Sequence, residues 1–217
     1  MENTGKQFVA EFIGTLLLVY IGAGSAMYFG LNGLVGVSLA FGFIVAAVVY
    51  TLGNISGAHI NPAVTIALWA YGLIKMKQVI LYIIAQVAGA IAAALLMKFT
   101  LVNGSGLGVT AIAEGVSPIT GMIVEIIATF ILVLTVFGCA VGKGKSNFAG
   151  LIIGLVVAAV IFTTGGITNT SINPARSIGP ALIAGDFTNL WVYIVGPIIG
   201  GLLAAGVFKY LDSGNSE

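Results

Sequence analysis

The stretches "SGAHINPAVT" (56–65) and "TNTSINPARS" (168–177) each contain the triplet Asn-Pro-Ala, once in each half of the chain. Asn is a favoured N-cap and Pro suits the first helical position. Each triplet therefore predicts a helix start, at Asn61, Pro62 and Ala63 and again at Asn173, Pro174 and Ala175. As helices, the apolar segments that begin there (61–72 and 173–184) would reach only about 16 to 18 Å into a hydrocarbon core of about 30 Å. Each is predicted to be a half-helix that enters the membrane without crossing it.

The rest of the 217-residue chain is strongly apolar: 59% of the residues are hydrophobic and 7% are charged, against about 25% charged in soluble domains. No Asp, Glu, Lys or Arg occurs between Glu11 and Lys75, a stretch far longer than the roughly 20 residues of one crossing. This composition predicts an all-α membrane protein. A net charge of +1 gives no basic surface for nucleic acid, and one cysteine and one histidine form no metal cluster, so neither nucleic acid, metal nor cofactor is expected.

Clusters of Gly, Asn, Ser and charged residues divide the apolar sequence into six segments that are long enough to cross a bilayer. These segments are residues 7–29, 34–53, 78–100, 119–141, 148–166 and 190–211. Parts of the first half of the chain recur in the second half at a nearly constant spacing. The aligned stretches are 10–26 with 124–140, 55–66 with 167–178, and 82–96 with 193–207.

Each copy of this repeat, about 7–100 and about 119–211, holds three crossings. An odd number of crossings turns the second copy over in the membrane, so the half-helices enter from opposite faces and meet near the midplane. The predicted fold is one transmembrane domain over 1–217, with six transmembrane helices and two re-entrant half-helices in an inverted 3+3 repeat.

The placement of basic residues predicts the orientation in the membrane. With the N-terminus in the cytoplasm, six of the eight basic residues fall on the cytoplasmic side, as the positive-inside rule requires. These six are Lys6, Lys75, Lys77, Lys143, Lys145 and Lys209, while Lys98 and Arg176 fall on the other side. We expect a multi-pass protein of the plasma membrane, in contact with lipid and with both termini in the cytoplasm.

The four residues before each Asn-Pro-Ala must be non-helical at membrane depth, which is tolerable only where the backbone lines a watery cavity. Their carbonyls then form a ladder of hydrogen-bond acceptors, from Gly57, Ala58, His59 and Ile60 in one copy and Asn169, Thr170, Ser171 and Ile172 in the other. If the side-chain oxygens of Asn61 and Asn173 cap their own helices, both amide groups keep their N–H donors for the same lumen. Such a track suits water or a small neutral solute, whereas the positive ends of two helix dipoles repel cations.

Four charged or titratable residues near the repeats each allow two interpretations. Arg176 is either a pore-lining donor or an arginine that snorkels to the headgroups, and its place at a half-helix start favours the pore. Glu11 and Glu125 occupy matching repeat positions, and we expect them to accept backbone N–H bonds from the re-entrant loops; a proton relay is the alternative. His59 is interpreted as a loop-packing residue, and a pH gate is the alternative.

Through "AEFIGT", "SGAHINPAVT" and "NTSINPARS", nearly the whole chain resembles the aquaporin (major intrinsic protein) family. The resemblance is greatest to archaeal and bacterial members, and Ile161 resembles the archaeal ones. The resemblance implies a homotetramer with one pore in each subunit. It also implies an outer selectivity filter at Phe41, Ile161, Thr170 and Arg176. Water-selective members usually have His where this chain has Ile161, and glycerol facilitators usually have Gly there and Asp in place of Ser177.

The sequence therefore predicts a passive water channel that excludes ions and protons and passes glycerol or other small neutral solutes more slowly. A broader small-solute facilitator, with water as the secondary solute, is the alternative. A coupled transporter also uses inverted repeats and broken helices, but it would need an ion-binding or titratable cluster at the midplane. A structural membrane protein is a third interpretation, and an enzyme is not expected because the chain has no constellation of nucleophile, base and orienting group.

Overall fold

The computed structural model describes residues 4–102, 104–142 and 145–213, so Lys143 lies outside the described residues. Within these ranges, six helical segments are long and apolar enough to cross a membrane, which confirms the predicted crossings. The first is α1 (Thr4–Leu18), continued by a π-helix (Val19–Ala23) and α2 (Gly24–Phe29). The others are α3 (Leu34–Ser56), α5 (Met76–Thr100), α6 (Pro118–Val136) with the π-helix Phe137–Val141, α7 (Ala149–Thr168) and α9 (Val192–Ser213).

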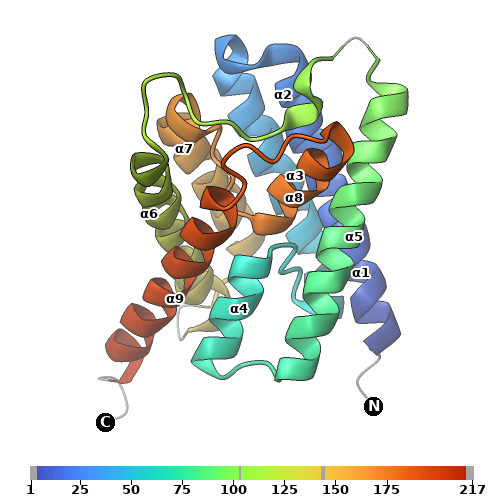
Figure 1. Ribbon diagram of the computed structural model, residues 1–217. Helices are drawn as coiled ribbons and strands as arrows, with labels where there is room; N and C mark the ends of the chain where they lie inside the picture. Colours follow the sequence, from blue (N-terminus) through green and yellow to red (C-terminus); the bar gives the residue numbers. More distant parts are fainter. Residues whose placement is uncertain (1–3, 103, 143–144, 214–217) are drawn as a thin grey trace.

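Two short helices begin at the Asn-Pro-Ala triplets, as predicted. They are α4 (Pro62–Tyr71), of 10 residues, and α8 (Pro174–Ala184), of 11 residues. The side-chain oxygen of Asn61 accepts from the Ala63 N–H at 2.9 Å, and that of Asn173 accepts from the Ala175 N–H at 3.1 Å. In Figure 1, α4 occupies one half of the molecule and α8 the other, and their starts meet between the halves. The chain thus forms the inverted repeat with two half-helices.

The two repeats pack against each other where α3 crosses α7. A Cβ atom on Gly42 would lie 2.7 Å from the Gly154 carbonyl oxygen, and one on Gly154 would lie 2.4 Å from the Gly42 carbonyl oxygen. Gly42 and Gly154 hold matching positions of the two repeats, since the same sequence spacing relates Asn61 to Asn173. The pseudo-two-fold axis of the repeat therefore passes between two backbones that touch because neither carries a side chain.

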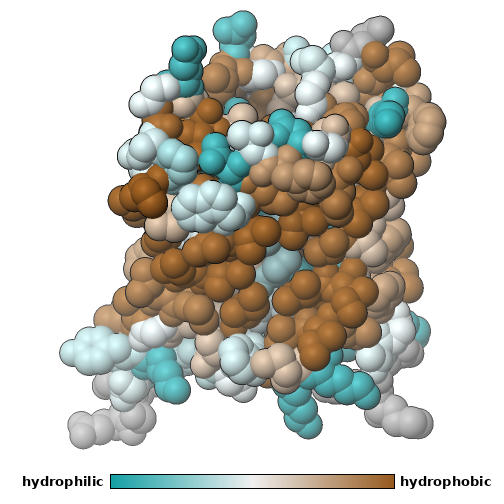
Figure 2. All heavy atoms as spheres, in the orientation of Figure 1, coloured by the Kyte–Doolittle hydropathy of each residue, from teal (hydrophilic) through white to brown (hydrophobic). Residues whose placement is uncertain are grey.

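The outer surface has the pattern expected of a protein in a bilayer. Figure 2 shows a broad hydrophobic band across the middle of the face in view, with hydrophilic residues gathered toward the two ends. Large apolar side chains that face outward include Phe43, Ile80, Leu155 and Leu203. Helix α1 begins and α9 ends at the same end of the molecule, where the Tyr71 hydroxyl donates to Asp212 at 2.9 Å. The protein is thus a multi-pass membrane protein with an even number of crossings.

Replacing Gly42 by Ala should weaken the contact between α3 and α7, because the new methyl group would collide with the Gly154 backbone and not with a flexible side chain. We expect a loss of about 1–3 kcal/mol in stability, typical of overpacking, measured as a lower melting temperature of the detergent-solubilised protein. Gly36→Ala in the same helix is the control, since a Cβ there would meet no atom within 4 Å. Equal melting temperatures for the two variants would contradict the close contact.

Candidate functional site

The loop before α4 is held by the buried carboxylate of Glu11. One oxygen accepts from the His59 N–H at 2.9 Å and the other accepts from the Ile60 N–H at 2.7 Å. The Ser56 hydroxyl also donates to Glu11, at 2.6 Å, and accepts from the Ala58 N–H at 3.0 Å. The amide of Gln86 adds a further donor to Glu11 at 2.8 Å. The carboxylate is therefore an acceptor for three elements, and its bonds leave the loop carbonyls free to point elsewhere.

Glu125 makes the corresponding bonds to the loop before α8. Its oxygens accept from the Ser171 N–H at 2.9 Å and from the Ile172 N–H at 2.7 Å. Here the hydroxyl of Thr168 takes the place of Ser56, donating to Glu125 at 2.8 Å and accepting from the Thr170 N–H at 3.2 Å. Both carboxylates have no exposed surface. With these bonds directed at the loops, the geometry supports the loop-holding interpretation over a proton relay.

The backbone of both loops is strained in the same pattern. Ala58 and Ile60 have φ of 47° and 45°, and Thr170 and Ile172 have φ of 40° and 48°. A positive φ is unfavourable for a β-branched residue such as Ile, and each such residue costs about 1–3 kcal/mol. The loop bonds to Glu11 and Glu125 offset this cost, because hydrogen bonds to a charged group contribute about 1.5–3 kcal/mol each.

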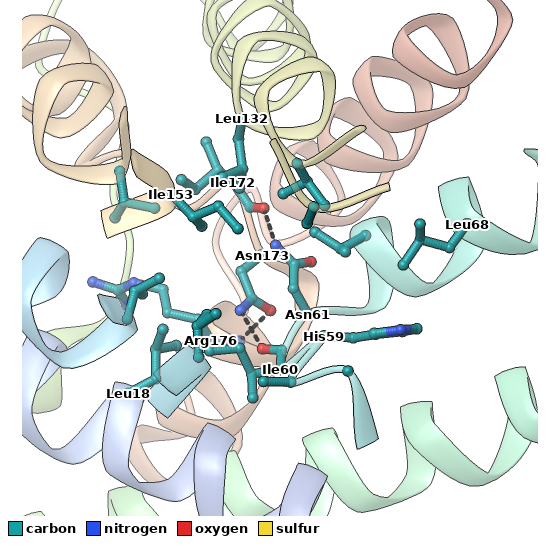
Figure 3. Close-up of a pocket in the computed structure, with 18 of the residues that line it drawn as sticks. Leu18, His59, Ile60, Asn61, Leu68, Leu132, Ile153, Ile172, Asn173 and Arg176 are labelled. Atoms are coloured by element: carbon teal, nitrogen blue, oxygen red, sulfur yellow. Dashed lines mark hydrogen bonds between the residues drawn. The ribbon is translucent and has the colours of Figure 1, made fainter. Parts of the chain in front are cut away.

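The two asparagines join the loops at the centre of the molecule. The Asn61 amide nitrogen donates to the Ile172 carbonyl at 2.7 Å, and the Asn173 amide nitrogen donates to the Ile60 carbonyl at 2.8 Å (Figure 3). One hydrogen of each amide is therefore used inside the protein, and one is left for the lumen. That the carbonyls of Ile60 and Ile172 also face the lumen stays a prediction, because each oxygen has a second lone pair. The expectation that each amide keeps both hydrogens for the lumen is wrong for one of the two hydrogens. The reason is that the two half-helix starts lie closer together than their sequences reveal.

A cavity of about 250 Å³ surrounds this centre. Its lining contains matching residues from both repeats, contributed by α1 and α6, by α3 and α7, and by the two loops. The pairs are Leu18 with Leu132, Val45 with Val157, Val49 with Ile161, Ile60 with Ile172, and Asn61 with Asn173. Apart from the loops and asparagines, these pairs are aliphatic, and the rest of the lining is mainly apolar, with Arg176 as its charged residue. The cavity is thus an apolar tube with a polar track along one side.

A second cavity of about 110 Å³ lies toward the α2 end of the molecule. Ile161 and Arg176 line both cavities, and Phe41 lines the central one. Arg176 is 2% exposed, and its guanidinium carbon lies 5.3 Å from the centroid of the Phe41 ring. Its Nη1 donates to the Gly108 carbonyl at 2.6 Å, while its Nε donates to no acceptor among the described residues. Ile161 and Arg176 thus lie where the two cavities adjoin, and the unpaired Nε of Arg176 is itself buried. That these side chains form a filter stays a prediction.

Thr170, His59 and Ser171 each have a hydroxyl partner near the track. The Thr170 hydroxyl lies 2.7 Å from that of Thr164, so its part in the filter stays a prediction. His59 Nδ1 lies 3.1 Å from the Thr65 hydroxyl. At the matching repeat position, the Ser171 hydroxyl lies 2.6 Å from that of Ser177. Asn169, the first residue of the second loop, lines the outer cavity and accepts from the Ala111 N–H at 3.0 Å.

The sequence did not predict the roles of four residues that support the site. Ser56 and Thr168 could have been found, because they are hydroxyl residues at matching repeat positions directly before the loops. Gln86 has no such signal, since the aligned position in the second repeat is Pro197. Gly108 contributes a carbonyl from an irregular connection, and backbone groups leave no mark in a sequence.

The chain matches the Major intrinsic protein family over residues 2–208. The protein belongs to this family. It is 42% identical over 245 aligned residues to Aquaporin AqpM of Methanothermobacter marburgensis, covering 98% of this chain and 100% of that protein. It is 40% identical to Aquaporin Z of Rhodopseudomonas palustris, covering 97% and 94%. The fold is also that of the aquaglyceroporin from Plasmodium falciparum, with a TM-score of 0.87 at 24% identity, covering 95% and 96% of the two chains. The resemblance seen in the sequence motifs is confirmed.

Glu125→Gln tests the loop-holding bonds. An amide has one acceptor oxygen, so its NH2 group would face a backbone N–H of Ser171 or Ile172 and leave a buried donor unsatisfied. We expect a loss of about 1–3 kcal/mol, seen as a lower melting temperature, together with reduced solute flux per folded protein. Glu114→Gln is the control, since Glu114 is an exposed carboxylate in the α5–α6 connection. A Glu125→Gln variant with unchanged stability and flux would rule out this role.

Proposed function

We propose that the protein is a passive channel that conducts water and excludes ions and protons. The observation that carries the proposal is the pair of asparagine amides, fixed at the centre of a mainly apolar tube by their own helix caps and by the opposite loop. Each amide offers its remaining N–H to the lumen, and the loop carbonyls of Gly57 to Ile60 and Asn169 to Ile172 offer acceptors on either side. The two repeats, about 7–100 and 119–211, build this path as one channel domain.

Positive charge along the path opposes cations. The starts of α4 and α8 carry the positive ends of two helix dipoles, each about half an elementary charge, and Arg176 adds a full one. A water molecule at the centre would turn its oxygen toward the amide donors, so waters on either side would point in opposite directions and a proton wire would be interrupted. The described lining of the central cavity includes no Asp or Glu. A coupled transporter is therefore disfavoured, and the family membership agrees with a channel and not an enzyme.

The filter residues Phe41, Ile161, Thr170 and Arg176 set the solute range in this proposal. Ile161 places a branched alkyl group at the constriction, which narrows the pore without adding a hydrogen-bonding nitrogen. Relatives with about 40% identity carry the name aquaporin, which favours water as the main solute. Slower passage of glycerol or similar neutral molecules is expected. A facilitator with water as the secondary solute is the alternative.

Stopped-flow light scattering on proteoliposomes tests the proposal. Water efflux should exceed that of empty liposomes, glycerol entry should be slower, and an imposed proton gradient should persist. Arg176→Val should admit more solute and weaken cation exclusion, because it removes both a donor and a positive charge from the constriction. Water flux equal to that of empty liposomes from correctly folded protein would favour a structural protein instead. Glycerol entry faster than water efflux would favour the broader facilitator.

Replacing Ile161 by His separates the two solute ranges in the same assay. The imidazole is larger and adds a hydrogen-bonding group, so glycerol entry should fall by roughly tenfold while water flux persists. Val49, the repeat partner of Ile161, lines the central cavity but not the outer one. Val49→Ile is the control because it reproduces the existing residue of the second repeat. Unchanged glycerol entry in Ile161→His would show that position 161 does not limit the pore.

We further propose that the protein is a homotetramer in the plasma membrane, with both termini in the cytoplasm. The family resemblance supports the tetramer, and the basic residues at the end where α1 begins support the orientation. Native mass spectrometry of detergent-extracted protein should give about four times the 22.1 kDa chain mass. A cysteine placed at Lys6 should be labelled by an impermeant maleimide only from the cytoplasmic side, and labelling from the outside would reverse the orientation.

A further inference from the structure

We propose that Gly22, in the Val19–Ala23 π-helix, is a positioning residue that sets how far the Phe41 ring reaches into the pore. This inference rests on the proposed channel function and extends it to a residue outside the cavity lining. Gly22 is buried, and it lies on the side of Phe41 that faces α1. Because Gly22 has no side chain, the Phe41 ring can lie against the π-helix. The ring then extends less far into the constriction.

The distances behind the ring leave no space for any side chain. A Cβ atom on Gly22 would lie 2.3 Å from both Cδ1 and Cε1 of Phe41 and 2.7 Å from its Cγ. Carbon atoms in contact need about 3.5–4.0 Å, so the ring would have to move by more than an ångström. Phe41 is 4% exposed, and the Arg176 guanidinium lies 5.3 Å from the ring centroid. A displaced ring would thus move away from α1, toward Arg176 and the lumen.

The same π-helix also supports the other side of the constriction. A Cβ atom on Gly108 would lie 2.7 Å from both the Cβ and the carbonyl oxygen of Ala23, the residue after Gly22. The Gly108 carbonyl is the acceptor for Arg176 Nη1. Two successive small residues therefore support Phe41 and the partner of Arg176. A π-helix changes the register of a helix by one residue, and such turns are frequent at functional sites.

A comparison of the two repeats supports this role independently. In the alignment of 10–26 with 124–140, Gly22 corresponds to Val136. In the alignment of α3 with α7 that pairs Gly42 with Gly154, Phe41 corresponds to Ile153. Val136 and Ile153 both line the central cavity. The first repeat thus combines the large ring of Phe41 with Gly22, which has no side chain. The second repeat combines two medium-sized aliphatic residues, Ile153 and Val136. The larger residue of the first repeat is therefore compensated by a smaller neighbour.

A double-mutant cycle in proteoliposomes tests the inference, with the variants Gly22→Ala, Phe41→Ile and both together. Gly22→Ala alone should lower water flux per folded protein by roughly threefold or more and reduce glycerol entry further, because the ring narrows the filter. In the Phe41→Ile background the same change should have little effect, since the shorter side chain leaves room for a methyl group. The control is Gly138→Ala in the second π-helix, where a Cβ would meet no atom within 4 Å.

An equal loss of flux in both backgrounds would overturn the inference, because Gly22 would then act independently of Phe41. So would an unchanged glycerol-to-water ratio in Gly22→Ala. If Gly22→Ala does not fold, the double variant Gly22→Val with Phe41→Ile tests the proposal, since it reproduces the pair in the second repeat. This double variant should fold and conduct. Its failure to fold would count against the proposal. Wild-type flux over empty liposomes tests the channel itself, and the cycle can be measured with whichever solute passes.

Discussion

Two buried carboxylates accept hydrogen bonds from the non-helical loops before the half-helices, and the pore depends on these bonds. Backbone N–H groups at membrane depth must find partners inside the protein, since lipid offers none. Glu11 and Glu125 each accept two of them, from the third and fourth residues of a strained loop. With the N–H groups bonded to the carboxylates, the loop carbonyls are left as the acceptors that the proposed path would use. The same bonds fix the starts of both half-helices, and with them the dipoles that meet at the centre.

The asparagines convert two separately held loops into one unit. Each amide oxygen caps its own half-helix, and each amide nitrogen bonds to the carbonyl that precedes the other half-helix. A movement of one repeat relative to the other would break both cross-bonds and expose unsatisfied polar groups at the midplane. Transporters of inverted-repeat architecture depend on such a movement. The geometry of the bonds is therefore an argument for a fixed path that solutes follow without a conformational cycle.

The sequence predicted those parts of the structure that occur in both repeats or that stand out as polar residues in an apolar chain. The crossings followed from apolar length, the half-helices from Asn-Pro-Ala, and the carboxylates from their matching positions near the starts of two crossings. The cross-bonds of Asn61 and Asn173 could not be predicted, because they depend on the distance in space between two segments from different halves of the chain. Gly108 could not be predicted for another reason: it acts through a backbone carbonyl, which every residue has. The role of Gly22 could not be predicted because the sequence contains many glycines and does not show which of them lies against the Phe41 ring.

In the proposed channel, the departures from symmetry place the selectivity filter at one end of the tube. Arg176 corresponds to Val64 and Phe41 to Ile153, so the two ends differ in charge and in size although the frame is duplicated. An arginine at that depth needs an acceptor, which the α5–α6 connection supplies through Gly108. A ring of that size needs space, which the π-helix after α1 supplies by having Gly22 where the other repeat has Val136. On this proposal, a duplicated pore acquires a filter through paired changes. One residue of each pair meets the solute, and the second, outside the lumen, makes room for the first or bonds to it.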